Sequence, residues 1–407
     1  MGDDALALVA RLAHVMVSGS FEGTVLAERR LKAVAAAYGQ QAEVAVLPES
    51  ATVTIGDRTR VVTAIPGIPP LNQVSAMKGW VGGVTEGRLS LAQAERELYA
   101  IASMPLPYGW PWRILGVVLF SVGFGLSVQA TWQQVIFTTL TGLFVGVLVV
   151  GTDFYPRLRW LAPLIASALV AMAALYASEQ GWISGGPIAL MLPALFVFIP
   201  GDSITMAMLE LSSGRMTAGA ARMVQSLAAL GVLAFGPVIA LAALGAQAGS
   251  LSDVAAPATL GVLAGWLGWV IFTAGVMLVF GMSLRDFPWA LAMVLGTYGV
   301  QLLTVRATGD LVGTWLAAAI LTAACLIVGR RRHSPPVYVL FLAAFFVLTP
   351  GSHGLRGLDT WIGGHPIQAI GDFGDMFGLL AAIALGILTA ATLLPAGALT
   401  QPGHRLT

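Results

Sequence analysis

The chain has 407 residues, of which 57% are hydrophobic and 10% charged, whereas an average soluble domain carries about 25% charged residues. A soluble fold could not hide that much apolar surface. A net charge of +1 gives no concentrated basic surface, which excludes a general electrostatic case for nucleic-acid binding. The composition therefore predicts an α-helical integral membrane protein with no nucleic-acid partner.

The charges divide the chain near residue 112. Residues 1–112 hold nine of the 21 Lys and Arg residues and ten of the 20 Asp and Glu residues. The chain starts with the acidic MGDD, and Arg11 and His14 interrupt the apolar run that follows. A secretory signal has a basic start and an unbroken apolar stretch. This segment is therefore predicted to be an amphipathic helix of a soluble domain, with a cytoplasmic N-terminus.

The first region alternates helical and strand patterns. Helices are predicted near 4–17, 22–38, 70–85 and 90–101, and strands near 43–47, 51–56 and 60–65. We interpret this as a small α/β domain over residues 1–108. A linker rich in Pro and Gly then leads into the membrane, where Trp110 and Trp112 suit the interface.

Ten apolar runs follow at roughly membrane-spanning length. They lie near 114–130, 133–150, 160–178, 187–201, 217–245, 258–283, 287–304, 309–328, 336–350 and 369–396. If the N-terminus is cytoplasmic, ten of the twelve basic residues from Arg113 onward lie at inside ends, and only Arg306 and Arg356 lie outside. This positive-inside bias predicts an even number of spans and cytoplasmic N- and C-termini.

An internal repeat relates the two halves of the membrane region. Residues 190–201 (LMLPALFVFIPG) and 340–351 (LFLAAFFVLTPG) share seven of twelve residues at an offset of 150. Each copy holds five spans, and an odd number of spans turns the second copy upside down. We predict two inverted five-helix repeats, over 109–252 and 253–407, the architecture of many secondary transporters.

The fourth and ninth runs are short, and both end in Pro-Gly. Broken spans leave free backbone groups, which a membrane tolerates only beside protein or a water-filled cavity. The two pairs, Pro200 with Gly201 and Pro350 with Gly351, are therefore predicted to line a substrate site. The alternative is that both are ordinary helix ends at the interface.

Polar residues follow the first break. Asp202, Ser203 and Thr205 suit a zwitterionic solute that carries a hydroxyl group, although Asp202 or Ser203 could instead cap a short helix. Glu210 follows a turn or two later, and we include it among the proton-coupling candidates.

Two carboxylates stand near the start of the tenth run. Asp372 and Asp375 have i, i+3 spacing, which places both on one helix face. Their counterparts under the 150-residue offset include Arg222, so Arg222 could pair with one carboxylate and leave the other to exchange protons. The alternative is that both carboxylates reach interfacial water.

Motifs for catalysis and cofactor binding are absent from the sequence. There is no Walker loop, no GxSxG, no HExxH and no dinucleotide fingerprint, and the single Cys325 forms no metal or redox pair. His353 and His365 share no helix face, which makes a weak metal site. We predict no cofactor, no metal and no enzymatic activity.

The chain resembles the threonine/serine exporter family. The resemblance covers nearly the whole chain and lies in SGSFEGTVLAERRLKAVAAAYG (18–39), Leu71-Asn72, GRLSLAQAERELYAI (87–101), FIPGDSITMAMLELSSGRMTAGAARM (198–223) and LTPGSHGLRG (348–357). The family's first stretch usually carries an Arg-Val-Glu triplet, where this chain has Thr24, Val25 and Leu26. This departure puts the role of the triplet in doubt here.

The resemblance implies export of threonine and serine across the bacterial inner membrane, coupled to protons, by a protein in contact with lipid; it leaves a homo-oligomer open. One rival is export of another small carboxylate. A second is a membrane-anchored enzyme with a catalytic N-terminal domain, and a third is a passive channel.

Overall fold

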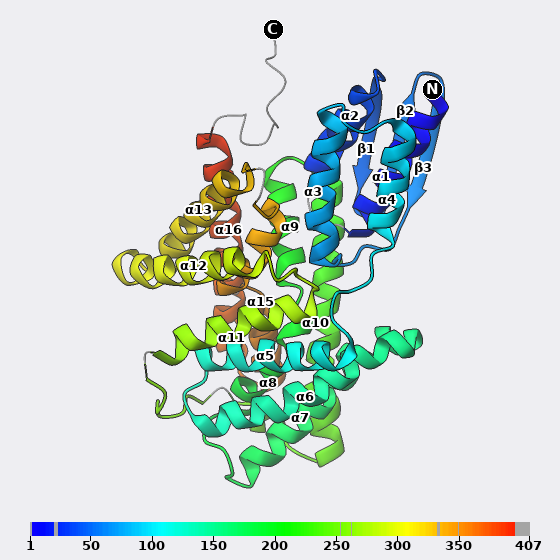
Figure 1. Cartoon of the computed structure of the whole chain (residues 1–407). Helices are drawn as coiled ribbons and strands as arrows, with labels where there is room; N and C mark the ends of the chain where they lie inside the picture. Colours follow the sequence, from blue (N-terminus) through cyan, green and yellow to red (C-terminus); the bar gives the residue numbers. More distant parts are fainter. Residues whose placement is uncertain are drawn as a thin grey trace.

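Two hydrophobic cores divide the chain into an N-terminal part and a larger helical part (Figure 1). The computed structural model describes residues 2–19, 23–252, 254–261, 263–331, 334–348 and 350–394, apart from the side chains of 350–352. In Figure 1 the N-terminal part, coloured blue, lies at the upper right. Leu71 and Val74 belong to the core of the larger part, whereas Met77 and Trp80 belong to the N-terminal core. The helix that carries all four therefore joins the two parts.

The N-terminal part is mainly helical, with a small sheet. Its elements are α1 (Gly2–Gly19), α2 (Gly23–Ala37), β1 (Ala42–Leu47), β2 (Ser50–Ile55), β3 (Arg58–Thr63), α3 (Leu71–Thr85) and α4 (Leu91–Ala102). The strands pair antiparallel in the order β1-β2-β3, with Ala42 opposite Ile55 and Ser50 opposite Thr63. Alternate residues of β2 are buried, because one face of the sheet is covered by α1 and α2.

The larger part consists of apolar helices with short 3₁₀ turns. The helices are α5 (Trp110–Val128), α6 (Trp132–Phe154), α7 (Ala162–Glu179), α8 (Pro187–Leu195), α9 (Gly201–Ser212), α10 (Met216–Leu244), α11 (Leu263–Val279), α12 (Phe287–Thr308), α13 (Asp310–Gly329), α14 (Val337–Phe345), α15 (Pro350–Ile362) and α16 (Pro366–Leu393). The 3₁₀ turns are η1 (Pro156–Trp160), η2 (Phe196–Phe198), η3 (Ala248–Ser250) and η4 (Phe346–Leu348).

Fewer helices qualify as spans than the ten predicted. Among the described residues, eight helices are long and apolar enough to cross a membrane, or nine if the bent pair Pro187–Phe198 and Gly201–Ser212 is one span. The remaining run, predicted over 258–283, contains the 17-residue helix α11. It is shorter because the described residues of 254–261 are not helical and Gly281, with a φ of +68°, lies in the turn that follows α11.

The order of elements repeats along the membrane part. In the first half α8, η2, α9 and α10 begin at residues 187, 196, 201 and 216, and in the second half α14, η4, α15 and α16 begin at residues 337, 346, 350 and 366. The preceding helices also correspond, α5 with α11, α6 with α12 and α7 with α13. The packing repeats as well, because α7 contacts α10 and α13 contacts α16.

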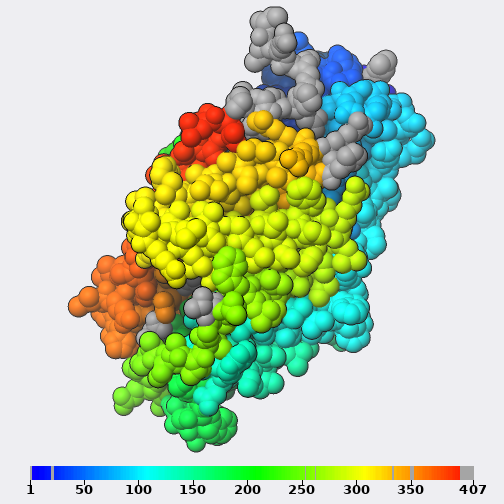
Figure 2. Space-filling model, turned by 60° about the vertical axis from the view of Figure 1, so that its left-hand side comes forward, coloured from blue at the N-terminus to red at the C-terminus, as the bar shows by residue number. Residues whose placement is uncertain are grey.

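The equivalent helices α5 and α11 pack closely against each other. A Cβ on Gly123 of α5 would overlap the backbone of Phe272, and a Cβ on Gly275 of α11 would overlap the backbone of Phe120. Small residues of this kind let two membrane helices approach backbone to backbone. By contrast α12 is the least buried candidate span, and Figure 2 shows yellow residues of the α12 and α13 region over much of one face.

Three turns of the membrane part contact the N-terminal part. Before α10, Arg215 forms a bidentate ion pair with Glu28, with N–O distances of 3.1 and 2.5 Å. In the loop after α11, the backbone oxygens of Phe280 and Gly281 accept from the amides of Leu71 and Asn72, at 2.8 and 3.0 Å. At the end of α13 and in the loop that follows, the backbone oxygens of Gly329 and Ser334 accept from the ammonium of Lys78.

A second set of loops meets at the other ends of these helices. The amide of Gly186 donates to Val254 (2.9 Å), and the amide of Thr259 donates to Ala130 (2.8 Å). The helix α10 starts at the Arg215 turn and runs 29 residues, about 43 Å, to residue 244. The two sets of loops therefore lie at opposite ends of the membrane helices.

Candidate functional site

The chain bends sharply at the first Pro-Gly pair. The segment of α8 and η2 meets α9 at an angle of 68°. Pro200 lacks an amide hydrogen, so α9 begins a new ladder at Gly201, whose amide donates to Ile199 at 2.9 Å. This bend confirms the first predicted break.

The second Pro-Gly pair differs from the prediction. Residues Val337–Ile362 count as one candidate span, in which the irregularity is the 3₁₀ turn η4. A proline in the first turn of α15 causes no loss of a hydrogen bond, which accounts for the continuation of the span. Pro350 and Gly351 start α15, and their side chains lie outside the described ones.

The less apolar residues after each Pro-Gly pair are also helical. The predicted runs leave residues 202–216 and 351–368 outside the spans, whereas α9 and α15 occupy most of these stretches. In α9, Asp202 places an acidic side chain in the first turn, a common position for such residues in helices. Ile204 and Ala207 are buried at a spacing of three, as one face of a helix requires.

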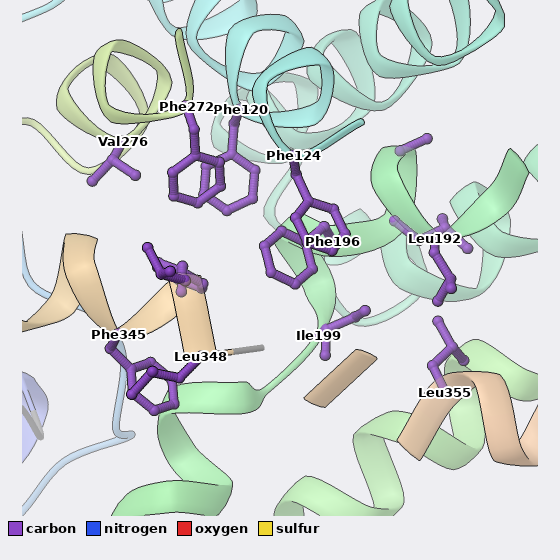
Figure 3. Packing of buried hydrophobic residues seen from close by; sticks show 14 of the residues in the cluster. Phe120, Phe124, Leu192, Phe196, Ile199, Phe272, Val276, Phe345, Leu348 and Leu355 are labelled. Carbon is purple, nitrogen blue, oxygen red and sulfur yellow. The ribbon is translucent and has the colours of Figure 1, made fainter. Parts of the chain in front are cut away.

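Aromatic rings join the two irregular segments at the centre of the membrane part. Phe196 of η2 and Phe346 of η4 have ring centroids 5.7 Å apart. Phe124 of α5 stacks on Phe196 at 3.8 Å, and Phe120 contacts Phe272 of α11 at 4.4 Å (Figure 3). In Figure 3, Phe345 and Leu348 lie on the segment opposite Phe196 and Ile199. The sequence-equivalent turns therefore meet across an apolar cluster.

The polar residues predicted after the first break lie on the first two turns of α9. Asp202 and Ser203 are half-buried, and the Asp202 carboxylate interacts with the backbone amide of Ser203. Thr205 is buried, and its hydroxyl has no hydrogen-bond partner among the described residues. Arg222 and Tyr338 of α14 lie within electrostatic range of Asp202. Groups from both halves therefore surround the first turn of α9.

Arg222 pairs with a different carboxylate from the one expected. Its Nε lies 3.0 Å from Oε2 of Glu210, and the two side chains are only 8% and 4% exposed. The sequence named Asp372 or Asp375 as the partner of Arg222, whereas this ion pair joins Arg222 to Glu210 on the adjacent helix α9. The other oxygen of Glu210, Oε1, accepts from the backbone amide of Thr24 at 3.0 Å. The N-terminal part thus contacts a buried ion pair of the membrane part.

The second half carries a contact at the equivalent positions. Thr360 donates to Asp372 at 3.3 Å between α15 and α16, as Glu210 and Arg222 join α9 and α10. Asp372 is half-buried, whereas Asp375 is exposed, so the two carboxylates do not share one buried surface. His353 and Arg356 of α15 and Asp310 of α13 are charged or titratable groups in electrostatic range of this region.

Sequence reasoning missed Asp359 on α15. This residue is fully buried, and neither carboxylate oxygen has a hydrogen-bond partner among the described residues. Its counterpart under the offset is Leu209, so the repeat gave no signal. The signal available was an ionisable residue near the end of an amphipathic helix, in a stretch that lies between two of the predicted runs.

Sequence reasoning also missed Thr24. Its contact with Glu210 uses the backbone amide, so it does not depend on the Arg-Val-Glu triplet that the family usually carries at this point. The N-terminal part also contains a cavity of about 370 Å³, lined by residues that include His14, Ser18, Gln73 and Met77. Among the described residues, no group of three or more His, Cys, Asp and Glu side chains is placed to hold a metal ion.

Eight apolar helices, a bent span and a central meeting of two irregular segments are the features of a multi-pass membrane transport protein. The chain belongs to the ThrE family, described as "Putative threonine/serine exporter", whose family model matches residues 7–244. This family is one of exporters and not of enzymes. The match ends at the last residue of α10, where the first half ends. No curated protein and no solved structure matches the chain significantly.

Proposed function

We propose that the chain exports threonine and serine across the bacterial inner membrane in exchange for protons. Membership of the exporter family supports the class of substrate. The observation that carries the proposal is the meeting of Phe196 and Phe346, because it brings the same turn of two repeated units to one point. Two related units that rock about such a point can expose it first to one side and then to the other.

An inverted arrangement of the halves is supported by the ends of equivalent elements. The turn before α10 contacts the N-terminal part through Arg215, whereas its counterpart before α16 contacts the distant set of loops, where Gly363 packs against Leu251. In the same way the loop before α14 contacts Lys78, whereas the loop before α8 contacts Val254. Equivalent turns at opposite ends are what two upside-down copies require.

A cytoplasmic N-terminus is supported by the position of the basic residues. The loops that contact the N-terminal part carry Arg215, Arg285, Arg330 and Arg331. The described residues of the distant loops, 129–131, 180–186 and 245–261, include no Lys or Arg. Because basic loops remain on the cytoplasmic side, the N-terminal part lies in the cytoplasm.

The substrate is proposed to bind between α9 and α14, close to Pro200 and Gly201. Asp202 and Ser203 offer a carboxylate and a hydroxyl to the substrate amine and hydroxyl, and Thr205 offers a buried hydroxyl without a partner among the described residues. The N-terminus of α9 favours a negative substrate group, such as the amino-acid carboxylate. Pro350 and Gly351 are proposed to complete the site from the second half.

Proteoliposomes test this proposal. Vesicles that contain the full chain are loaded with threonine or serine, and efflux is measured with and without an imposed pH gradient. Efflux that increases with the gradient and competes between the two amino acids is expected. Efflux of another small carboxylate alone would replace the substrate, and the absence of gradient-dependent efflux of either class would refute the exporter.

A further inference from the structure

Asp359 is a buried carboxyl group to which the contacts described so far assign no role. Its side chain is 0% exposed on α15, one turn before that helix ends at Ile362. Neither oxygen has a hydrogen-bond partner within the described part of the chain. Its neighbour Thr360 is engaged by Asp372, and its own backbone oxygen accepts from Gly363 at 2.9 Å. Only its carboxyl group is unsatisfied.

The helices that pack against α15 bring no hydrogen-bonded cation to this carboxyl. They are α8, α9, α10 and α16. No residue of α8 is titratable, and the charged residues of α9 are Asp202 and Glu210. Arg222 of α10 is bonded to Glu210, and α16 adds two further carboxylates, Asp372 and Asp375. On α15 itself, His353 and Arg356 precede Asp359 by one to two turns and make no hydrogen bond with it.

A carboxylate in such a place is costly. An ionised group that is buried without a partner loses its hydration, and a protein avoids this loss by keeping the group neutral. A neutral carboxyl carries one proton. In the arrangement described here, Asp359 therefore holds a proton inside the membrane part.

The position of Asp359 also gives this proton a route. Gly363, four residues later, packs against Leu251 in the distant set of loops. Opening of that end of the molecule would bring water to Asp359, which could then release or take up a proton. Closure removes the water and retains the proton.

We propose that Asp359 is the residue that carries the proton in the transport cycle, an inference that rests on the proposed exporter function. The carboxylate binds a proton when the distant end is open, becomes buried in the neutral form, and loses the proton to water when the other end opens. The reaction is a protonation and its reversal, so no other reactant is required. The equivalent residue of the first half, Leu209, cannot do this.

The test compares exchange with coupling. Purified full-length Asp359→Asn is placed in proteoliposomes beside wild type, and two rates are measured: exchange of labelled for unlabelled threonine at equal pH, and threonine efflux driven by a pH gradient, with internal pH followed by a fluorescent dye. The exchange rate of D359N is expected to stay within about twofold of that of wild type. The gradient-driven component of its threonine efflux is expected to fall at least tenfold. The exposed Asp310→Asn is the matched control and should keep both.

Each outcome decides between the hypotheses. If wild type shows exchange but no gradient dependence, proton coupling and with it the proposed function are wrong. If wild type is coupled and folded D359N stays coupled, Asp359 is not the proton carrier. If folded D359N loses exchange as well, Asp359 binds substrate and the inference is overturned.

A second measurement does not depend on a variant. Dicyclohexylcarbodiimide reacts with protonated carboxyl groups in apolar surroundings, and peptide mass spectrometry identifies the modified residue. Wild type is expected to be labelled at Asp359, at a rate that falls as the pH rises, and Asp375 should not be labelled under the same conditions. Labelling elsewhere with none at Asp359 would contradict the inference even if D359N does not fold.

Discussion

Phe196 and Phe346 are 150 positions apart in the sequence, and their ring centroids lie 5.7 Å apart in the structure. They are the first residues of η2 and η4, and Phe124 and Phe272 from α5 and α11 contact Phe196 on its other sides. The repeat detected in the sequence is therefore also a contact. Removal of one ring should therefore weaken the packing of both halves.

Phe196→Ala should destabilise the protein by about 3–5 kcal/mol, the usual cost of deleting a buried aromatic ring. The matched control is Phe235→Ala, because Phe235 of α10 is exposed on the membrane part. Thermal unfolding in detergent is the measurement. A melting temperature for F196A equal to that of F235A would show that the central aromatic cluster contributes little to stability.

The buried pair of Glu210 and Arg222 gives a second prediction. Glu210→Leu alone removes the carboxylate that pairs with the buried Arg222 guanidinium, and breaking a buried ion pair from one side costs about 3–5 kcal/mol. The double variant Glu210→Leu, Arg222→Leu should recover much of the loss, because neither charge remains. The exposed pair of Glu86 and Arg88 is the control, since exposed ion pairs contribute about 0–1 kcal/mol. A double variant no more stable than E210L would contradict this account.

The same pair is expected to hold the N-terminal part in place. Thr24→Pro removes the amide that donates to Glu210 while proline remains acceptable in the first turn of α2. Limited proteolysis of the linker that contains Pro105 should be faster in T24P than in wild type. Equal rates would show that the ion pair does not help to dock the N-terminal part.

The helices that the sequence predicted best are those whose pattern lies in one continuous stretch of chain. Hydropathy and the offset of 150 residues predicted where α10 and α16 lie, because both properties belong to continuous stretches of chain. Mean hydropathy did not identify the helices α9 and α15, because their apolar residues form only one face. The spacing of Ile204 and Ala207 indicates such a helix better.

Partner choice was beyond the sequence for a different reason. Arg222 has several carboxylates within reach in principle, and only the packing of α9 on α10 selects Glu210. The burial of Asp359 likewise depends on four other helices. A pattern within one stretch of sequence does not indicate contacts between separate helices.

Lys78 gives a prediction about pH. Its ammonium donates to backbone oxygens of the loop before α14, among them those of Gly329 and Ser334, each at 2.8 Å. Burial lowers the pKa of Lys78, the nearby Arg30 lowers it further, and Asp286 partly opposes both.

Because the folded pKa lies below the unfolded value, the unfolded chain binds more protons in the interval between them, and stability from this group rises with pH there. Lys78→Met removes the contribution. The melting temperature of wild type should therefore rise relative to that of K78M as the pH is raised from 7 toward 10. A wild-type melting temperature that falls relative to that of K78M over this range would contradict the lowered pKa of Lys78.

The close packing of α5 on α11 predicts the effect of a single methyl group. Gly123→Ala places a Cβ against the backbone of Phe272, which cannot give way as a flexible side chain would. Overpacking of this kind costs about 1–3 kcal/mol. Gly296→Ala in α12 is the control, because no atom lies within 4 Å of the added carbon. Thermal unfolding of the two variants should separate them, and equal stability would show that the two helices can move apart.

The proposed inversion of the two halves gives the last prediction. Ser213 lies in the turn before α10 and His365 lies in the equivalent turn before α16, and both side chains are exposed. In a Cys325→Ala background, Ser213→Cys and His365→Cys are treated with a membrane-impermeant maleimide on intact cells. His365→Cys should react at once, whereas Ser213→Cys should react only after the membrane is opened, because its turn lies on the side of the N-terminal part, which is proposed to be the cytoplasmic side. Reaction of both residues from the same side would mean that the two halves are parallel, and rocking about a shared centre would no longer account for transport.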